Sequence, residues 1–307
     1  MLTLFTTPKP FRGIFNTIQR NAIRSWTLLY PRPEIILVDD VEGSDSVVKE
    51  FGLHHIPDVE RNEFGTPLVS SIFETGQRAA SNRFVCYINA DIILTDSFLQ
   101  GVQSAAQMLS ENNFLLIGRR WNVYLKNYWD FEKGDWQERL KKYAIENGYH
   151  ETAGATDYFV FPKGVNWDIP PFAIGRGAWD GWFLWNACRM GIPVIDATEV
   201  ITVYHQQHDY SHWKGIKHNS YNYFKSKEFK RNERLRGTFA HQYNIWDSTH
   251  ILTRGGLQLA SSQRWFFANI LRLKMCVTYY LHLFHPYSYP LVAFLKTIRK
   301  LVKLLKK

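Results

Sequence analysis

Cysteine is scarce in this chain of 307 residues, and its three cysteines, Cys86, Cys188 and Cys276, lie far apart. Because no Cys-x-x-Cys pair occurs, neither a disulfide framework nor a zinc knuckle is indicated. The sequence also has no Asn-x-Ser/Thr glycosylation acceptor, and residues 1–11 lack the basic start and apolar stretch of a signal peptide. We therefore expect the protein to work in a reducing cytoplasm.

Several familiar cofactor and metal motifs are missing as well. No Gly-x-Gly-x-x-Gly follows the first expected strand, and no P-loop sequence occurs. These absences argue against the usual dinucleotide and P-loop phosphate sites. No His-Glu-x-x-His accompanies the histidines of the chain, which argues against a zinc hydrolase.

The formal net charge of +9 is distributed unevenly along the chain. Residues 1–150 carry 16 Lys and Arg against 18 Asp and Glu, whereas residues 151–307 carry 21 against 10. Two segments hold the excess, since residues 214–236 and residues 291–307 each have a net charge of +6. The remainder is slightly acidic, so we expect no nucleic-acid-binding surface on the body of the protein.

Short apolar runs alternate with helical patterns over most of the sequence. The expected strands are residues 2–5, 35–38, 84–88, 114–117, 158–161, 194–195 and 200–203. The expected helices are residues 14–23, one capped by Thr66 and continuing to Ala79, residues 96–109, and one opening near Trp179. Residues 121–150 show no clear period. The alternation predicts an α/β fold with a largely parallel sheet, whose ligands bind at the carboxyl ends of the strands.

Three carboxylates follow expected strands, namely Asp39, Asp40 and Asp91. Each alone is explained equally well as the cap of the next helix. Acidic groups that converge at one sheet edge repel one another unless a cation or hydrogen-bond donors offset them. A divalent metal shared with a substrate diphosphate would do so, and this is the reading that we favour for the group.

Histidines and an aspartate among tryptophans form two further candidate groups. His205, His208 and His212 follow another expected strand; they either ligate a metal or face solvent. Asp180 lies in Trp179-Asp180-Gly181-Trp182, at the start of the expected helix. It is either a first-turn residue stabilised by the helix dipole or a general base in an aromatic pocket suited to sugars.

Taken together, these segments resemble the GT-A-fold glycosyltransferases of the family-2-like group. The matching segments are Thr6-Thr7-Pro8, Val38-Asp39-Asp40, Asn89-Ala90-Asp91-Ile92, Trp179-Asp180-Gly181-Trp182 and residues 205–212. The resemblance covers residues 1–212, which implies a nucleotide-sugar-binding catalytic domain there. It leaves residues 213–307 as a basic, aromatic-rich helical extension.

The resemblance also implies roles for individual residues. Thr6, Thr7, Pro8, Asp39 and Asp40 would bind the nucleoside of an activated sugar, with Arg78 as a possible diphosphate contact. Asn89 stands where the family's DxD motif has its first acid, and Asp91 keeps the position that holds Mn²⁺ or Mg²⁺. His205 or His208 would complete the metal site. Asp180 would be the base of an inverting reaction, although Trp179 replaces the usual Glu before it.

The last residues of the sequence suggest where the protein works. In residues 291–307 the apolar and basic side chains segregate with the period of a helix, and no acidic residue occurs. Such a helix either packs on the domain or lies on an anionic bilayer, which we favour. Residues 214–236 would then face the same membrane or a lipid-diphosphate acceptor.

The function expected from the sequence is that of a cytoplasmic, membrane-peripheral glycosyltransferase. It would move a sugar from a nucleotide-sugar to an acceptor hydroxyl of a cell-surface glycan or a lipid-linked acceptor. A sugar-phosphate nucleotidyltransferase would need a glycine-rich N-terminal loop, and residues 6–11 contain no glycine. A catalytically degenerate fold that serves as a membrane-bound binding or assembly subunit remains the alternative, because Asn89 and Trp179 depart from the family pattern.

Overall fold

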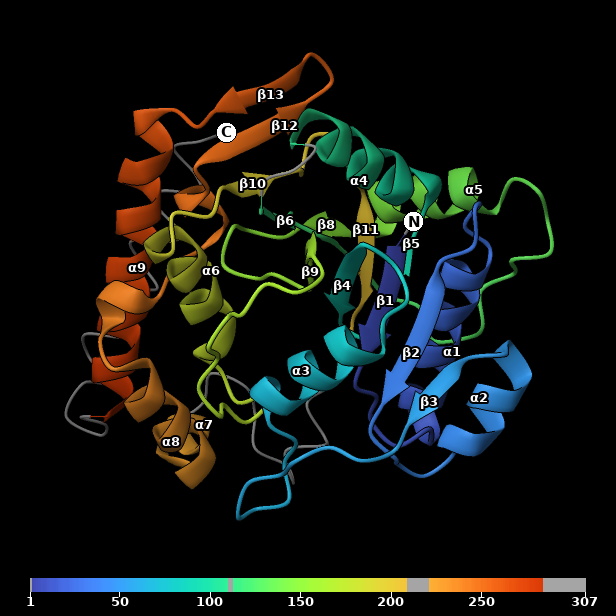
Figure 1. Cartoon of the computed structure of the whole chain (residues 1–307), viewed down its shortest axis with the longest axis horizontal. Coiled ribbons are helices and arrows are strands. Elements are labelled where there is room, and N and C mark those ends of the chain that lie inside the picture. Colours follow the sequence, from blue (N-terminus) through green and yellow to red (C-terminus); the bar gives the residue numbers. More distant parts are fainter. Residues whose placement is uncertain (1, 110–112, 209–220, 284–307) are drawn as a thin grey trace.

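A large mixed sheet runs through the middle of the molecule (Figure 1). The computed structural model describes residues 2–109, 113–208 and 221–283. Within them the sheet has nine strands in the order β13-β12-β10-β6-β9-β4-β1-β2-β3. Their bounds are β1 Leu2–Thr6, β2 Glu34–Val38, β3 His54–Ile56, β4 Phe84–Ile88, β6 Leu115–Ile117, β9 Tyr158–Pro162, β10 Val194–Asp196, β12 His250–Thr253 and β13 Gly256–Leu259.

The sheet is parallel on both sides of one antiparallel strand. Strands β3, β2, β1 and β4 are mutually parallel, as are β6, β10 and β12. Strand β9 pairs antiparallel with both β4 and β6, and β13 is antiparallel to β12 at the edge. The expected α/β fold with a largely parallel, mixed sheet is therefore confirmed.

Helices cover both faces of the sheet, which explains why its strands are apolar on both sides. Alternate residues of one strand enter different cores, since Leu4 packs with α1 (Gly13–Thr27) and α4 (Asp96–Leu109), while Phe5 faces the opposite side. That second core is lined by α3 (Val69–Ala79) and α6 (Trp179–Arg189), which lie in front of the strands in Figure 1.

One helix start differs from the expectation. Thr66 does not cap α3, because the residue before the helix is Leu68 and no side chain caps it. The amide of Thr66 instead donates to Oδ1 of Asn62, and Leu68 is bridged to Ala173. These local bonds keep the chain extended through Leu68, so the helix begins later than the Thr-Pro pair predicts.

A second, smaller sheet contains the segment for which the sequence showed no clear period. Its order is β5-β11-β7-β8, with bounds β5 Ile92–Leu94, β7 Trp121–Val123, β8 Tyr149–His150 and β11 Val203–Gln206. Helix α5 (Trp136–Asn147) packs on it through Leu140 and Ala144. The strand expected at residues 200–203 therefore begins only at Val203 and continues to Gln206 as β11.

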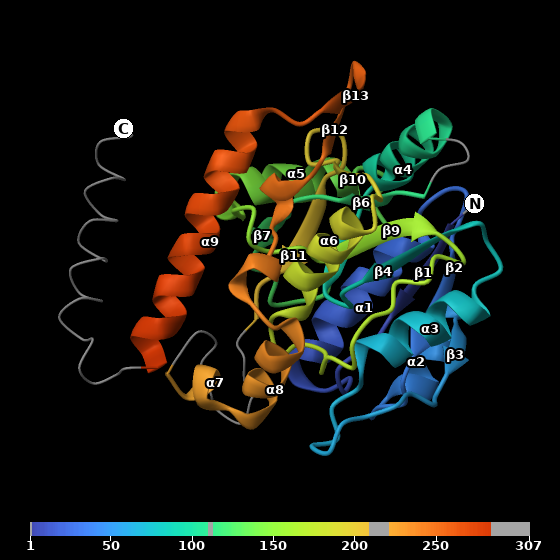
Figure 2. The ribbon, with the colours of Figure 1, turned by 60° about the vertical axis from the view of Figure 1, so that its left-hand side comes forward.

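The C-terminal part is mainly helical, as expected, but it also extends the large sheet. Its helices are α7 Tyr221–Lys225, α8 Lys227–Arg236 and α9 Ser262–Leu283, whereas α2 (Ser44–Phe51) lies between β2 and β3. Strand β12 pairs with β10, and Arg264 of α9 forms an ion pair with Asp196 at the end of β10. Figure 2 shows α9 along one side of the molecule. The division into residues 1–212 and 213–307 stays a prediction, and residues 291–307 lie outside the described part.

The contact between α3 and β1 gives a test of the packing. Gly76 of α3 lies against Phe5, and an added Cβ would be 2.3 Å from the ring carbon Cδ2. Overpacking of this kind costs about 1–3 kcal/mol, whereas alanine regains about 1 kcal/mol of helix propensity. We expect Gly76→Ala to lower the free energy of unfolding in urea titrations.

Gly134→Ala is the matched control, because nothing lies within 4 Å of a Cβ added there. Equal stability of the two variants would show that α3 does not pack on Phe5 as described.

Candidate active site

The turn after β4 carries Asp91 to the carboxyl end of the large sheet. Asn89, Ala90 and Asp91 connect β4 to β5, and the amide of Ile92 donates to the carbonyl of Asn89 at 3.2 Å. Strand β5 pairs antiparallel with β11, which places His205 opposite Ile92. Two segments more than a hundred residues apart are thereby held side by side.

Asp91, His205 and His208 form a compact group of possible metal ligands. One ligand atom from each residue lies within 4.8 Å of the others. Oδ2 of Asp91 is 3.2 Å from Nε2 of His208 and 3.7 Å from Nε2 of His205. The structure thus brings together the three residues that the sequence analysis named as metal ligands, while His212 lies outside the described residues.

The electrostatics of this group favour ligation. Burial raises the pKa of Asp91, but His205, the hydrogen bond from His208 and the charge of Lys9 outweigh it and hold that pKa well below its usual range. Burial, with the positive charge of Arg120, lowers the pKa of His205 to about 4. At neutral pH the group therefore offers an ionised carboxylate and an imidazole with a free lone pair.

An unsatisfied oxygen shows that these residues fit a metal. Oδ1 of Asp91 is buried and has no hydrogen-bond partner. Buried polar atoms are nearly always paired, so an orphaned carboxylate oxygen next to two imidazoles is a place for a cation. Imidazole ligands suit a transition ion better than Mg²⁺, which takes oxygen ligands.

Asn89 is held by a buried ion pair that the sequence analysis did not find. Its Nδ2 donates to Oδ1 of Asp157 at 2.9 Å, and Nη1 of Arg120 donates to both oxygens of Asp157 at 2.6 and 2.7 Å. Tyr87 donates to Oδ1 of Asn89 at 3.2 Å. An aspartate at position 89 would face the carboxylate of Asp157 with no proton to donate, which explains why the first acid of the DxD pattern is an amide here.

Asp180 lies in the first turn of α6, where its Oδ1 accepts a hydrogen bond from the amide of Gly181 at 2.9 Å. Burial raises its pKa, with a further upward contribution from Asp157, whereas Arg120 acts in the opposite direction. Asp180 therefore belongs to the same electrostatic environment as the ion pair beside Asn89. A carboxylate with a raised pKa is suited to accept a proton.

The residues expected to bind the nucleoside lie at the ends of β1 and β2. The hydroxyl oxygens of Thr6 and Thr7 are buried and have no hydrogen-bond partner, and Pro8 follows them. Asp39 is 2% exposed, has a left-handed φ of 95° and forms an ion pair with Arg61, whereas Asp40 is exposed. Unsatisfied hydroxyls at a strand end are consistent with a ligand site, and the role of these residues stays a prediction.

Arg78 is not brought into this group. Its side chain is 69% exposed on α3 and pairs with Glu74 of the same helix. Helix α3 leads into the beginning of β4, whereas Asp91 follows the end of that strand.

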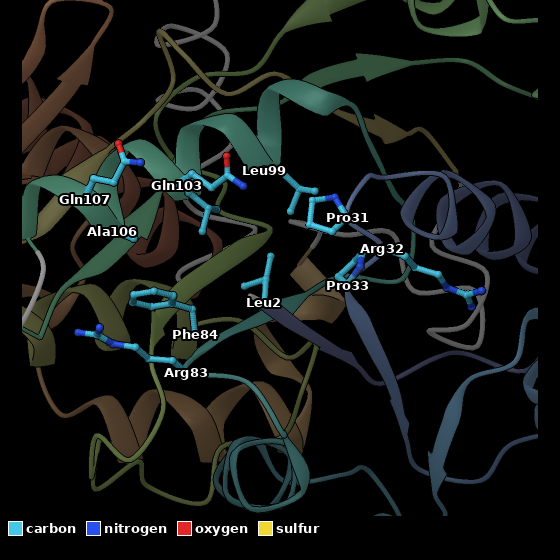
Figure 3. A pocket seen from close by; sticks show the side chains of 11 residues that line it. Leu2, Pro31, Arg32, Pro33, Arg83, Phe84, Leu99, Gln103, Ala106 and Gln107 are labelled. Atoms are coloured by element: carbon cyan, nitrogen blue, oxygen red, sulfur yellow. The ribbon is translucent and has the colours of Figure 1, made fainter.

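A cavity of about 290 Å³ also lies at this opposite end, between α4 and the first residues of β1 and β4 (Figure 3). Its wall includes Leu2, Phe84 and Leu99, so it is separate from the Asp91 group.

Lys9, Arg120, Asn122, Glu151 and Asp157 surround the site, yet none was singled out from the sequence. Asn122 lies in β7, within residues 121–150, the stretch that showed no clear period, and Arg120 and Glu151 directly flank that stretch. Lys9 directly follows Thr6-Thr7-Pro8, and its closeness to that segment was the one available signal.

Neither a protein-family model nor a curated protein matches the sequence. Several solved structures are similar. S. aureus TarS 1–349 in complex with UDP-GlcNAc has a TM-score of 0.44 and 13% identity, and the match covers 76% of this chain and 70% of that chain. The mannosyltransferase PcManGT from Pyrobaculum calidifontis, in complex with GDP-Man and Mn²⁺, has a TM-score of 0.41 and 16% identity, covering 69% of this chain and 59% of its own.

Glucosyl-3-phosphoglycerate synthase from Mycobacterium tuberculosis, in complex with Mn²⁺, UDP and glucosyl-3-phosphoglycerate, has a TM-score of 0.40 and 14% identity. That match covers 69% of this chain and 75% of the synthase. These neighbours are GT-A glycosyltransferases of the family-2-like kind, the class that the sequence resemblance names.

Metal binding by the Asp91 group is tested by thermal shift. We expect Mn²⁺ to raise the melting temperature of the unaltered protein, because an ion that binds only the folded state stabilises it. Asp91→Ala should abolish this shift, whereas Arg78→Ala, which removes an exposed charge outside the group, should leave it unchanged. An equal Mn²⁺ shift in the Asp91→Ala protein would place the metal elsewhere.

Proposed function

We propose that the protein is a metal-assisted glycosyltransferase that moves a sugar from a nucleotide-sugar to an acceptor hydroxyl. The observation that carries the proposal is the orphaned Oδ1 of Asp91 beside two histidine nitrogens at the carboxyl edge of an α/β sheet. Ligands of such sheets bind at this edge. The similar structures with UDP-GlcNAc and with GDP-Man and Mn²⁺ support the same class of donor.

In this proposal, the residues at the carboxyl edge of the large sheet hold the metal, bind the donor and position the turn that carries Asp91. Asp91, His205 and His208 would hold the divalent ion, which when bound neutralises negative charge on the diphosphate of the donor. Thr6 and Thr7, whose buried hydroxyls have no partner, would hydrogen-bond the donor at the end of β1, and Asp39 would do so at the end of β2. The Arg120–Asp157 ion pair keeps Asn89, and with it the turn that carries Asp91, in place.

Asp180 is the proposed base. It would accept the proton of the acceptor hydroxyl as that oxygen attacks the anomeric carbon, which corresponds to an inverting reaction. Its raised pKa supports this task, because a stronger base removes a hydroxyl proton more readily.

The raised pKa of Asp180 also has a consequence for stability. The unfolded chain loses this proton at a lower pH than the folded protein, so the ionised carboxylate lowers the free energy of unfolding once the pH exceeds the ordinary aspartate pKa. Asp180→Asn removes this contribution. We expect its melting temperature at pH 7 to be at least that of the unaltered protein, with the difference disappearing as the pH falls below about 4.

The same variant tests the reaction. We expect the Asp180→Asn protein, assayed with Mn²⁺ and with water as the hydroxyl that receives the sugar, to release nucleoside diphosphate from a panel of nucleotide-sugars about 10²–10⁴-fold more slowly. Nucleoside diphosphate binding should be retained, because Asp180 is not among the proposed donor contacts. Full turnover in this variant would exclude Asp180 as the base. If the unaltered protein binds the nucleotide but turns over no donor in the panel, the degenerate binding subunit becomes the better account.

We further propose that the protein acts at an anionic membrane surface, on a glycan or a lipid-linked acceptor. Two features of the C-terminal part support this. No helix in the described part of the chain is long and apolar enough to cross a membrane. Helix α9 nevertheless exposes an apolar stripe with helical spacing, made of Phe266, Ile270, Leu273, Val277 and Tyr280. After Asp247 the sequence has ten Lys and Arg and no acidic residue, which is typical of a segment that binds anionic lipids.

Vesicle cosedimentation tests the membrane contact. Phe266 and Leu273 are 59% and 65% exposed, so Phe266→Ser with Leu273→Ser should leave the fold intact. We expect binding to vesicles containing phosphatidylglycerol to fall about tenfold or more, because each large apolar side chain contributes roughly 1.5–3 kcal/mol when buried. Ile145→Ser, at an equally exposed position on α5, is the control. Unchanged binding by the double variant would exclude α9 as the contact.

A further inference from the structure

A chain of hydrogen bonds leads from the end of β8 to the metal-facing histidine. The amide of Thr152 donates to Oε1 of Glu151 at 2.8 Å. Nδ2 of Asn122 donates to Oε2 of Glu151 at 2.8 Å, and Oδ1 of Asn122 lies 3.0 Å from Nδ1 of His205. Asn122 is fully buried and is the register partner of His205 between β7 and β11.

The direction of each proton in this chain follows from chemistry. The Glu151 carboxylate can only accept hydrogen bonds, so it must face the NH₂ group of Asn122 and not the amide oxygen. The oxygen of Asn122 then faces His205, and it too can only accept. Nδ1 of His205 must therefore carry the proton, which leaves the lone pair on Nε2.

We propose that Glu151, acting through Asn122, is a positioning residue that sets the tautomer of His205 so that the Nε2 lone pair faces Asp91. The consequence for metal affinity rests on the proposed function, whereas the tautomer itself is a property of the metal-free protein. The opposite tautomer would put a proton on Nε2, 3.7 Å from Oδ2 of Asp91, too far for a hydrogen bond and in the place of a metal.

The site is built so that this choice matters. His205 is 7% exposed, and its Nδ1 faces Asn122 while its Nε2 faces Asp91, so the uncharged ring that can ligate a metal carries its one proton toward one or the other. The negative charge of Asp91 favours a proton on Nε2, whereas the oxygen of Asn122 favours one on Nδ1. Within the described residues, Nδ1 makes its hydrogen bond to the side-chain oxygen of Asn122, at 3.0 Å, and this bond holds the proton on Nδ1.

Glu151→Gln should reverse the whole chain with almost no change in shape. The Thr152 amide keeps the Gln oxygen facing it, so the new NH₂ group faces Asn122. Asn122 then turns its oxygen to that NH₂ group and its own NH₂ to Nδ1 of His205, which must accept. The proton of His205 moves to Nε2. Adding Asn122→Asp places carboxylate oxygens, which can only accept, toward the new NH₂ group and toward Nδ1 of His205. The proton of His205 then returns to Nδ1.

The test compares the unaltered protein, Glu151→Gln, and Glu151→Gln with Asn122→Asp. The tautomer of His205 is read from ¹⁵N NMR of the metal-free proteins, with the signal assigned by His205→Gln. Mn²⁺ affinity is measured by calorimetry. We expect Glu151→Gln to protonate Nε2 and to weaken Mn²⁺ binding about 10–100-fold, and the double variant to recover both. Glu146→Gln, exposed on α5, controls for the lost charge.

The outcomes separate this proposal from the function it rests on. An unaltered His205 tautomer in Glu151→Gln overturns the proposal, and so does a changed tautomer with unchanged Mn²⁺ affinity. A general structural effect of the substitution would weaken binding without recovery in the double variant, which also overturns it. If even the unaltered protein binds no Mn²⁺, the metal-assisted function fails, while the NMR comparison still decides whether Glu151 sets the tautomer.

Discussion

The buried carboxylate of Asp91 is the constraint on which the arrangement at this sheet edge depends. An ionised group without partners is expensive to remove from water, yet one oxygen of Asp91 has no hydrogen bond at all. The fold tolerates it because His208, Lys9 and the polar surroundings hold the negative charge. The destabilisation that remains is of the kind expected at a functional site, where a ligand completes the set of partners.

The small second sheet supplies the side chains that surround the carboxylate of Asp91. Strand β11 delivers His205, β7 delivers Asn122, and the turn before β5 delivers Asp91. The Arg120–Asp157 pair then ties β9 of the large sheet to this group through Asn89. A one-residue slip between β7 and β11 would turn Asn122 away from His205, so strand register here controls chemistry as well as packing.

Sequence patterns predicted the six inner strands of the large sheet, from β10 to β2, because these are buried on both faces and stand out as apolar runs. The outer strands β3, β12 and β13 were missed, since they are only partly buried and lack such runs. Helix α4 was predicted with the bounds that the structure shows, Asp96–Leu109. The start of α3 was predicted too early, since the bond from Thr66 to Asn62 competes with the capping that Thr-Pro suggests. Strands β7 and β8 were missed because three and two residues are too few to show a period.

The sequence by itself determined the α/β class, the acids at the strand ends and the candidate metal ligands Asp91, His205 and His208. The class and the strand-end acids follow from local periodicity and residue chemistry, and the metal ligands are implied by the family resemblance, so none of them needed knowledge of distant contacts. Only the tertiary structure decided which of these residues meet, that Arg78 stays apart, and that Asn122 and Glu151 stand behind His205. Those facts depend on pairings between segments far apart in the chain, and on protonation states that burial sets after the chain has folded.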